Sequence, residues 1–490
     1  MTTHRTSNLR NRFITGAAWM TATRWGLRLL GLINTAILAR LLAPADFGLL
    51  AMAMIVVSFI EIWFWLGVDT ALIQNKNATP DDFNSAWTLR IMQGALVSLV
   101  MVASSSLAAK FFNEPRLVTI LWVLAPAILL TAANNIGIVN FQKEVNFRPE
   151  FIMTLGSKIF SVIVTIFLGF WLRNYWALVL GIFSGYLATF VLSYMMHPYR
   201  PRLSLKRAAA LWSFSKWVLV GNLGSFLSAK ADELIVGKMV SPTDLGIYSV
   251  ASDIGQMATN ELARPLNRVL FPLFSTMQDD LARVRATYLK AIGGVNAVTL
   301  PTGVGLALLA PEAVEVLLGS QWLAAIPYLS IFAIYGAVRF LYSSAPSLLT
   351  ALGYVRKCAY LQWFESIMLV LLCIGGGLAY GLPGIALARV LVAVGVGLLT
   401  LSFLKRYVAI NLSDFMGTLW RPILSTVLMA VTIQLAATLL PVNLIVMFAG
   451  KLVIGIISYV AYALFLWRIS GRPDGIESIA LSYLQQFSRN

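Results

Sequence analysis

The sequence predicts an all-α membrane protein that crosses the bilayer many times. Three observations support this: 59% of the 490 residues are hydrophobic, only 12% are charged, and long apolar segments recur from one end to the other. A soluble globular chain carries roughly 25% charged residues, so about half of the expected charge is missing. Apolar runs of about 18 or more residues can cross a hydrocarbon core of ~30 Å as helices.

Fourteen such segments are predicted, separated by turn-forming residues such as Pro44 with Asp46 and Gly381 with Pro383. In chain order they cover residues 13–39, 46–73, 86–110, 117–141, 151–172, 176–197, 211–239, 244–274, 287–311, 325–352, 357–380, 382–404, 418–440 and 442–468.

The basic residues of the connections predict the orientation. If the N-terminus is placed in the cytoplasm, the cytoplasmic connections carry roughly four times as many Lys and Arg residues as the connections on the other side. The few basic residues on the other side are Arg40, Lys110, Arg116, Arg173 and Lys238. We therefore expect both termini in the cytoplasm. The net charge of +16 follows this pattern and does not indicate nucleic-acid binding.

The chain also contains an internal repeat at a constant offset of 198 residues. The stretch 37-ILARLLAPADFGLL-50 matches 235-IVGKMVSPTDLGIY-248, and Asp81–Asp82 matches Asp279–Asp280. Locally, the Pro-x-Asp-x-Gly motif predicts a tight turn with an aspartate cap. Six spans per repeat predict two parallel lobes. The expected division is residues 1–200 and 211–405 for the lobes, 201–210 for a cytoplasmic linker, 406–468 for two added spans, and 469–490 for a cytoplasmic tail.

Several stretches resemble one transporter family. They are 38-LARLLAPADFGLLAMA-53, 68-VDTALIQ-74, 269-VLFPLFSTMQDDLARVRATYLK-290 and 317-LLGSQWLAAIPYLSIFAIYGAVRF-340. The chain resembles the polysaccharide-transport branch of the multidrug/oligosaccharidyl-lipid/polysaccharide (MOP) exporter superfamily, which includes Wzx flippases and colanic-acid-type exporters. The resemblance implies a flippase for undecaprenyl-diphosphate-linked oligosaccharide units in the bacterial inner membrane. It also implies alternating access by two lobes that rock around a central cavity.

Arginines within predicted spans are candidates for substrate binding, because intramembrane charges are costly and mark transport pathways. Arg24 and Arg28 stand four residues apart on one helix face. Glu261, Arg264 and Arg268 form a second stripe. Arginine grips diphosphate through forked, charge-assisted hydrogen bonds. Two alternatives remain: the first pair extends to the lipid headgroups, or Arg264 pairs with Glu261.

A second set of intramembrane charges predicts either a coupling-ion site or structural ion pairs. The set consists of Asp232, Glu233, Glu365, Arg389 and Asp69. A coupling cation, Na⁺ or H⁺, is one interpretation. The other is a buried structural pair, for example Glu365 with Arg389. Asp232 and Glu233 are adjacent and therefore point about 100° apart on a helix.

Metal and cofactor chemistry is not indicated. Cys358 and Cys373 lie in or beside one apolar run, and the only histidines are His4 and His197, so neither a disulfide framework nor a metal site is expected. The Asp81–Asp82 and matched Asp279–Asp280 pairs are interpreted as solvated loop residues rather than metal ligands. We expect no cofactor beyond the coupling cation.

Two other function classes fit the sequence less well than a flippase. A drug extruder of the same architecture should have an acidic pore, whereas two spans here are rich in arginine. A membrane polymerase or ligase for sugar chains usually has a long outer loop, and no outer connection here exceeds roughly a dozen residues. The expected protein is therefore not an enzyme. Its expected partners are the membrane, the lipid-linked substrate and polymerase or export machinery, and it is expected to be a monomer.

Overall fold

The computed structural model describes residues 2–64, 72–75, 77–144, 146–207, 226–438 and 443–472, without the side chains of 2–14, 17, 63–64 and 262–269. The chain divides into two compact units. Unit 1 contains Met1–Lys230 and Ser241–Gly246, and unit 2 contains Ala231–Val240 and Ile247–Asn490. The predicted domain boundaries stay predictions.

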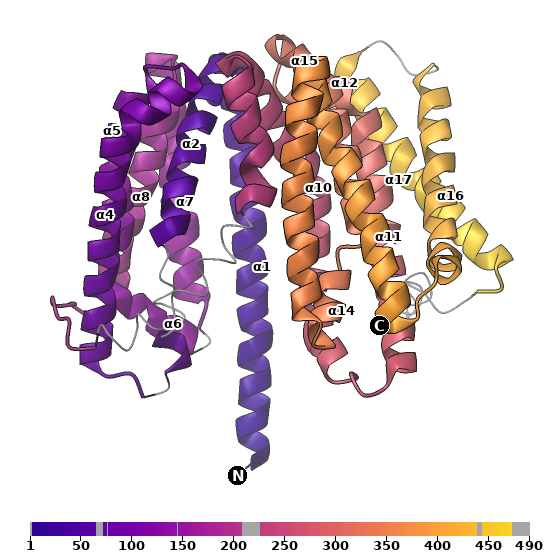
Figure 1. Cartoon of the computed structure of the whole chain (residues 1–490), viewed down its shortest axis with the longest axis horizontal. Coiled ribbons are helices and arrows are strands. Elements are labelled where there is room, and N and C mark those ends of the chain that lie inside the picture. Colours follow the sequence, from indigo (N-terminus) through magenta and orange to yellow (C-terminus); the bar gives the residue numbers. More distant parts are fainter. Residues whose placement is uncertain are drawn as a thin grey trace. The chain divides into compact units, whose positions relative to one another are not determined.

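Unit 1 is built from helices that run side by side. α4 packs on α5, α7 packs on α8, and α1 packs along α7 (Figure 1). The elements are α1 (Thr2–Leu41), α2 (Pro44–Phe64), α4 (Pro80–Phe112), α5 (Leu117–Ala132), η1 (Ile136–Ile138), α6 (Val139–Lys143), α7 (Arg148–Leu172) and α8 (Trp176–Met196).

The predicted span 117–141 is broken in the structure. α5 and the following helical segment meet at an angle of 54°. The break leaves backbone carbonyls without helical partners, and neighbouring side chains satisfy them: Arg90 donates to the Thr131 carbonyl at 3.0 Å, and Tyr194 donates to the Ala133 carbonyl at 3.0 Å. Such replacement hydrogen bonds are what allow a helix to break at membrane depth.

Unit 2 is also helical. α10 begins in unit 1 and continues through unit 2. The elements are α10 (Pro242–Ser275), α11 (Leu281–Leu308), α12 (Ala310–Leu317), η2 (Ser320–Ala325), α13 (Ile326–Phe340), α14 (Ala345–Ala351), α15 (Val355–Val408), α16 (Leu412–Ala437) and α17 (Leu444–Ile469). Residues 226–239, before α10, are helical as well.

α15 consists of two helical halves joined at a kink. Its 54 residues would measure about 80 Å as one straight helix, far more than a bilayer core of ~30 Å. The backbone turns at Gly381, whose φ of 64° and ψ of −143° are not helical and suit glycine. Gly376 and Gly384 bring the two halves close, since a Cβ at Gly384 would lie 2.1 Å from the Gly376 carbonyl oxygen. The predicted boundary at Gly381 is therefore confirmed.

The all-α fold class is confirmed, and the fourteen-span arrangement stays a prediction. The described residues contain nine helices long and apolar enough to cross a membrane, or ten if the bent pair counts as one span. α1 and α10 are long enough but are not among them. These two helices carry the arginines predicted to bind substrate: Arg24 and Arg28 on α1, and Arg264 and Arg268 on α10.

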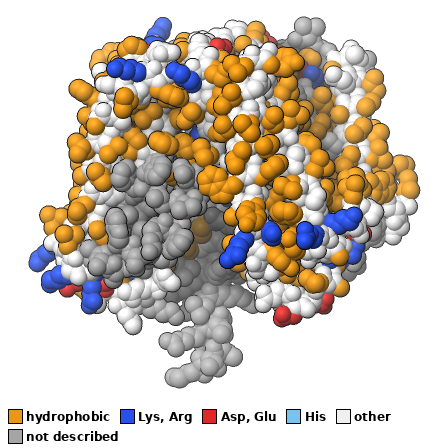
Figure 2. Space-filling model, in the orientation of Figure 1, with side chains coloured by type: hydrophobic (Ala, Val, Ile, Leu, Met, Phe, Trp, Pro, Cys, Tyr) orange, Lys and Arg blue, Asp and Glu red, His pale blue; other side chains and the backbone are white. Residues whose placement is uncertain are grey.

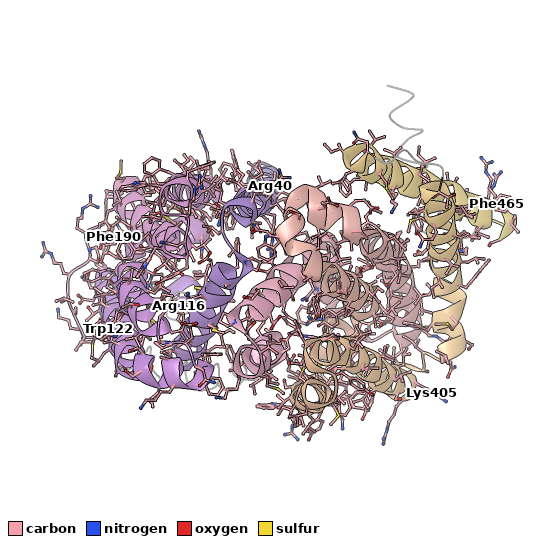
Figure 3. The ribbon with its side chains drawn as sticks, turned by 90° about the horizontal axis from the view of Figure 1, so that it is seen from above. Arg40, Arg116, Trp122, Phe190, Lys405 and Phe465 are labelled. Atoms are coloured by element: carbon pink, nitrogen blue, oxygen red, sulfur yellow. The ribbon has the colours of Figure 1, made fainter. Side chains whose placement is uncertain are left out.

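The surface of both units fits a lipid environment. Figure 2 shows hydrophobic side chains over the middle of the visible helices, with Lys and Arg gathered toward the helix ends. Trp122 and Phe465 lie at the periphery of their own units (Figure 3), where they are 54% and 58% exposed. Large exposed apolar side chains of this kind are expected where lipid rather than water is the solvent.

The Pro-x-Asp-x-Gly motif forms the predicted capped turn in both repeats. Asp46 accepts a hydrogen bond from the Ala43 amide at 3.0 Å, at the start of α2. Asp244 accepts hydrogen bonds from the Ser241 amide at 3.4 Å and the Ser241 hydroxyl at 2.8 Å, at the start of α10. Because an acceptor at this position satisfies donors that a helix N-terminus leaves open, the local interpretation of the motif is confirmed.

The glycines of the same motif allow a close backbone contact within unit 1. A Cβ at Gly48 would lie 1.7 Å from the Pro242 carbonyl oxygen, and a Cβ at Gly246 would lie 1.9 Å from the Pro44 carbonyl oxygen. The first turns of α2 and α10 therefore touch reciprocally, each through its own glycine. No larger residue fits at either position without moving the backbone.

Candidate functional site

Arg24 and Arg28 lie on the face of α1 that points away from α7. The opposite face packs on α7, with Trp19 against Phe151 at a ring distance of 4.8 Å and Gly26 against Leu155. Each arginine is two residues from Gly26, about 200° around the helix. Arg24 is half-buried and Arg28 is exposed. The structure thus keeps both guanidinium groups out of the α1–α7 contact, on one shared face.

The second predicted stripe is described only in part. Glu261 on α10 is buried, at 5% exposure. The side chains of Arg264 and Arg268 lie outside the described part of the structure, as does Asp69. Their contribution to a substrate site stays a prediction.

Asp232 and Arg389 form a buried ion pair inside unit 2. Arg389 Nε donates to Asp232 Oδ2 at 2.8 Å, and its Nη2 contacts Oδ1, which makes the pair bidentate. The Tyr248 hydroxyl also donates to Oδ2, at 2.7 Å. Asp232 is fully buried and Arg389 is 4% exposed. The three residues come from three segments: Asp232 from helix 226–239, Tyr248 from α10 and Arg389 from the second half of α15.

This pairing differs from the example given by the sequence, in which Glu365 pairs with Arg389. The guanidinium of Arg389 is instead held by Asp232, 157 residues away in the chain. Glu365 is half-buried in the first half of α15 and attracts Arg339 electrostatically. Since both Asp232 oxygens accept hydrogen bonds, the guanidinium occupies the position where a coupling cation would bind that carboxylate. Glu233 is buried at 6% exposure.

Arg339 and Tyr335, which were not among the predicted site residues, lie next to this pair. Arg339 on α13 donates from Nη1 to the Tyr335 hydroxyl at 3.0 Å, and Arg389 Nη1 donates to the same oxygen at 3.4 Å. The signal was available, because Arg339 stands in an otherwise apolar span and such charges mark functional positions.

A second buried ion pair, also not predicted, joins α12 to α17. Lys451 Nζ lies 2.5 Å from Glu312 Oε1, and the two residues are 6% and 4% exposed. The pair connects α17 to the body of unit 2. Glu312 Oε2 is buried and has no hydrogen-bond partner in the described part of the chain.

The segment 198–207, called the linker strap here, is bound along the first turns of α4. Three backbone amides donate to side chains of that helix: Arg202 to Asn84 at 2.8 Å, Ser204 to Thr88 at 2.9 Å, and Arg207 to Ser85 at 3.1 Å. Ser85 and Thr88 are buried beneath it. An irregular segment thereby satisfies its amides with polar groups of one helix face.

Asp81 and Asp82 hold the basic end of the linker strap. Lys206 Nζ lies 3.6 Å from Asp81 and Arg207 Nε lies 4.0 Å from Asp82. In the matched pair of the second repeat, Asp280 accepts from the Arg283 amide at 3.0 Å and caps α11. In the first repeat, Asp81 and Asp82 are therefore more than solvated loop residues, because they bind the linker strap.

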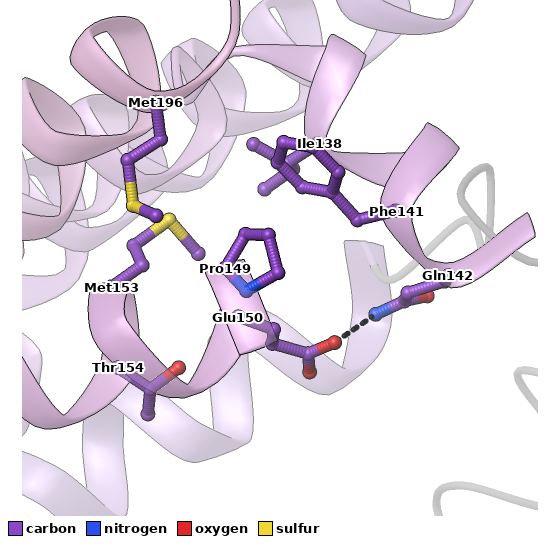
Figure 4. A pocket seen from close by; sticks show the side chains of 8 residues that line it. All are labelled: Ile138, Phe141, Gln142, Pro149, Glu150, Met153, Thr154 and Met196. Carbon is purple, nitrogen blue, oxygen red and sulfur yellow. Dashed lines mark hydrogen bonds between the residues drawn. The ribbon is translucent and has the colours of Figure 1, made fainter. Parts of the chain in front are cut away.

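A small pocket in unit 1 is too small to be the cargo site. Its volume is about 120 Å³, whereas ligand pockets measure roughly 300–1,000 Å³. Gln142 donates to Glu150 at 3.1 Å at its polar side (Figure 4). The other lining residues, mostly apolar, are Ile138, Phe141, Pro149, Met153, Thr154 and Met196.

The known proteins that this chain resembles in sequence are named for polysaccharide biosynthesis or transport. The family described as "Polysaccharide biosynthesis protein" matches residues 37–327. The lipopolysaccharide biosynthesis protein WzxC of Escherichia coli (strain K12) is 23% identical over 424 residues, 85% of each chain. The teichuronic acid biosynthesis protein TuaB of Bacillus subtilis (strain 168) is 24% identical, over 86% of this chain and 89% of the relative. The succinoglycan biosynthesis transport protein ExoT of Rhizobium meliloti (strain 1021) is 24% identical, over 74% of this chain and 73% of the relative.

Solved structures show the same fold. The lipid II flippase MurJ in an inward closed conformation matches with a TM-score of 0.73 and 17% identity, covering 92% of this chain and 99% of MurJ. An inward-facing MATE transporter of the MOP superfamily matches with a TM-score of 0.63 and 12% identity, covering 78% of this chain and 94% of the transporter. With more than half of the sequence matched, this chain belongs to the polysaccharide biosynthesis protein family.

Proposed function

We propose that this protein is a flippase that moves lipid-linked oligosaccharide units across the bacterial inner membrane for polysaccharide biosynthesis. One observation supports the proposal: over most of its length the chain is similar to transport proteins in sequence and to a flippase in fold. The sequence is similar to WzxC and ExoT, and the fold is that of a lipid II flippase. In this proposal the chain carries cargo and catalyses no covalent step.

The physical task explains why such a protein needs cationic helices. A lipid-linked sugar carries a diphosphate and many hydroxyl groups, and each unsatisfied polar group costs several kcal/mol in hydrocarbon. Arg24 and Arg28 supply two guanidinium groups on a face of α1 that is not used for packing on α7. We assign them to the diphosphate, together with Arg264, Arg268 and Glu261.

Export in cells tests this assignment. Arg24→Ala with Arg28→Ala should abolish polymer export, and the two Arg→Lys changes should restore it in part, because a point charge lacks the forked geometry. Arg468→Ala, at the exposed end of α17, serves as the matched control and should export normally. Normal export by the double alanine variant, inserted at wild-type levels, would remove these arginines from the substrate site.

For energy coupling we propose that Glu233 or Glu365 binds the coupling cation, Na⁺ or H⁺. Asp232 is less suited, because Arg389 already neutralises it. The diphosphate carries about two negative charges, and each gains about 2.3 kcal/mol per 100 mV on leaving a negative cytoplasm. Export should therefore slow when the membrane potential is collapsed. Glu233→Gln with Glu365→Gln should remove dependence on ion gradients, and an unchanged dependence would place coupling elsewhere.

The remaining parts of the proposal concern placement and assembly. Both termini face the cytoplasm, the protein works as a monomer, and polymerase or export machinery receives its cargo. Reporter fusions after Arg207 and after Arg472 should give cytoplasmic signals. A periplasmic signal at either position contradicts the orientation.

A further inference from the structure

α13 gathers hydrogen-bond donors inside a membrane span. Tyr335 and Arg339 are one helical turn apart and share a face. The guanidinium carbon of Arg339 lies 5.9 Å from the centre of the Tyr335 ring, and its Nη1 donates to the Tyr335 hydroxyl. Tyr342, just beyond α13, is 9% exposed. All three belong to the apolar segment Ser320–Ala351.

The donors of this group outnumber its acceptors. The Tyr335 oxygen accepts from both Arg339 and Arg389, so its own hydrogen is left to donate. In the described part of unit 2 that hydrogen has no acceptor, and the Tyr342 hydroxyl has no hydrogen-bond partner. Arg339 has five N–H donors and uses one of them on a described residue.

Of the two arginines in this group, only Arg389 has a carboxylate bound to it. Asp232 neutralises Arg389 through a bidentate ion pair. Arg339 is attracted by Glu365 but forms no ion pair with any described acidic residue. An arginine with unused donors inside a membrane span is costly, unless water or a ligand satisfies it. A ligand that accepts hydrogen bonds and carries negative charge would satisfy these donors.

We propose that Tyr335, Arg339 and Tyr342 form an oxyanion-binding site, which holds a phosphate or carboxylate of the cargo during transport. The proposal rests on the proposed function and adds a cargo contact within unit 2. A guanidinium fork beside phenol donors matches the oxygens of either anion. A sugar hydroxyl fits less well because it also donates. The site therefore selects anionic cargo.

Binding to the purified full-length protein tests the proposal and identifies the source of the anion. Inorganic pyrophosphate represents the lipid linker, and glucuronate represents an acidic sugar. Arg339→Gln should weaken binding of at least one probe about 10- to 100-fold, the range for a lost hydrogen bond to a charged group. Tyr335→Phe should weaken the same probe by up to about tenfold. Loss for pyrophosphate alone assigns the site to the linker, and loss for glucuronate alone assigns it to the sugar.

Tyr288→Phe is the matched control. The Tyr288 hydroxyl is also buried without a described partner, but it lies in the hydrophobic core beside Phe274. Its loss should leave binding of both probes unchanged. If Arg339→Gln fails to fold, Arg339→Lys and Tyr335→Phe carry the test. Unchanged binding of both probes in these variants, or no binding by the wild type, overturns the proposal.

Export measured on the same variants separates this site from the proposed function. If the wild type exports polymer and Arg339→Gln binds and exports normally, the site is wrong and the flippase stands. If the wild type binds an anion through Arg339 but moves no lipid-linked oligosaccharide, the site stands and the flippase function fails.

Discussion

The two units use charge in different ways. In unit 2, two ion pairs, Asp232–Arg389 and Glu312–Lys451, are enclosed among helices, with every member 6% exposed or less, while a third, Arg285–Asp414, is partly exposed. The ion pairs described in unit 1 are open to solvent at helix ends, with at least one partner about half exposed in each. They are Glu114–Arg116, Asp81–Lys206 and Asp82–Arg207.

The difference shows where each unit depends on electrostatics. Breaking a buried pair leaves an uncompensated charge and costs about 3–5 kcal/mol, whereas an exposed pair contributes about 0–1 kcal/mol. Unit 2 thus depends on buried ion pairs between segments that are distant in the sequence. Unit 1 is held by close backbone contacts, such as Gly48 with Pro242, and by neutral hydrogen bonds from the linker strap.

The largest effect is expected at Arg389. Arg389→Met leaves Asp232 buried without its counter-charge, so the free energy of unfolding should fall by about 3–5 kcal/mol. Adding Asp232→Asn should recover much of this loss, because no charge then remains. Unfolding in detergent measures both variants. A single variant as stable as the wild type would show that unit 2 is not braced by this pair.

A backbone contact should give the next largest effect, in unit 1. Gly48→Ala places a Cβ on the Pro242 carbonyl and should destabilise the protein by about 1–3 kcal/mol, the usual cost of overpacking. Gly31→Ala is the matched control, since nothing lies within 4 Å of its added Cβ. Equal stabilities of the two variants would contradict the contact.

The linker strap should depend more on neutral hydrogen bonds than on charge. Asn84→Ala removes the acceptor shared by the Arg202 amide and the Tyr199 hydroxyl and should cost about 1 kcal/mol. Asp81→Asn should cost less, because its partner Lys206 is 75% exposed. Trypsin cleavage after Arg202 should accelerate more in the first variant. The reverse order would mean that ion pairs hold the strap.

The smallest effect is a pH dependence at Glu114. The hydrogen bond from Arg116 lowers the pKa of this carboxyl group. A carboxyl whose folded pKa lies below its unfolded value stabilises the protein above the unfolded pKa, near 4.3, and loses that contribution as the pH falls through the folded pKa. Arg116 is 48% exposed, so the gain is about 0.5 kcal/mol or less. Arg116→Gln should reduce the loss of stability at acid pH by this amount, as measured in unfolding curves, and an unchanged loss would assign it to other carboxyls such as Asp82.

Local features were predictable from the sequence because their causes are local. Composition gave the helical membrane class, the Pro-x-Asp-x-Gly motif gave two capped turns, and Gly381 gave the break in α15. The charge of Arg339 was also readable, as an arginine within an apolar segment.

Pairings between distant residues were not predictable. The partner of Arg389 is 157 residues away, and Glu312 and Lys451 are 139 residues apart. Several acidic residues competed for each basic one, and spacing alone does not choose among them. The linker strap was not predictable for the same reason, since its amides donate to α4 residues more than a hundred positions away. Every residue except proline has a backbone amide, so the sequence does not show which amides bind a helix.

The linker strap also affects how the polypeptide is made. During synthesis, α4 emerges more than eighty residues before the strap that covers Ser85 and Thr88. Until residue 207 has left the ribosome, these hydroxyls and the neighbouring carboxylates lack their final partners. The first turns of α4 are therefore completed by residues that follow α8. If the gene is split into two co-expressed fragments, the cut belongs after Arg207 rather than after Met196.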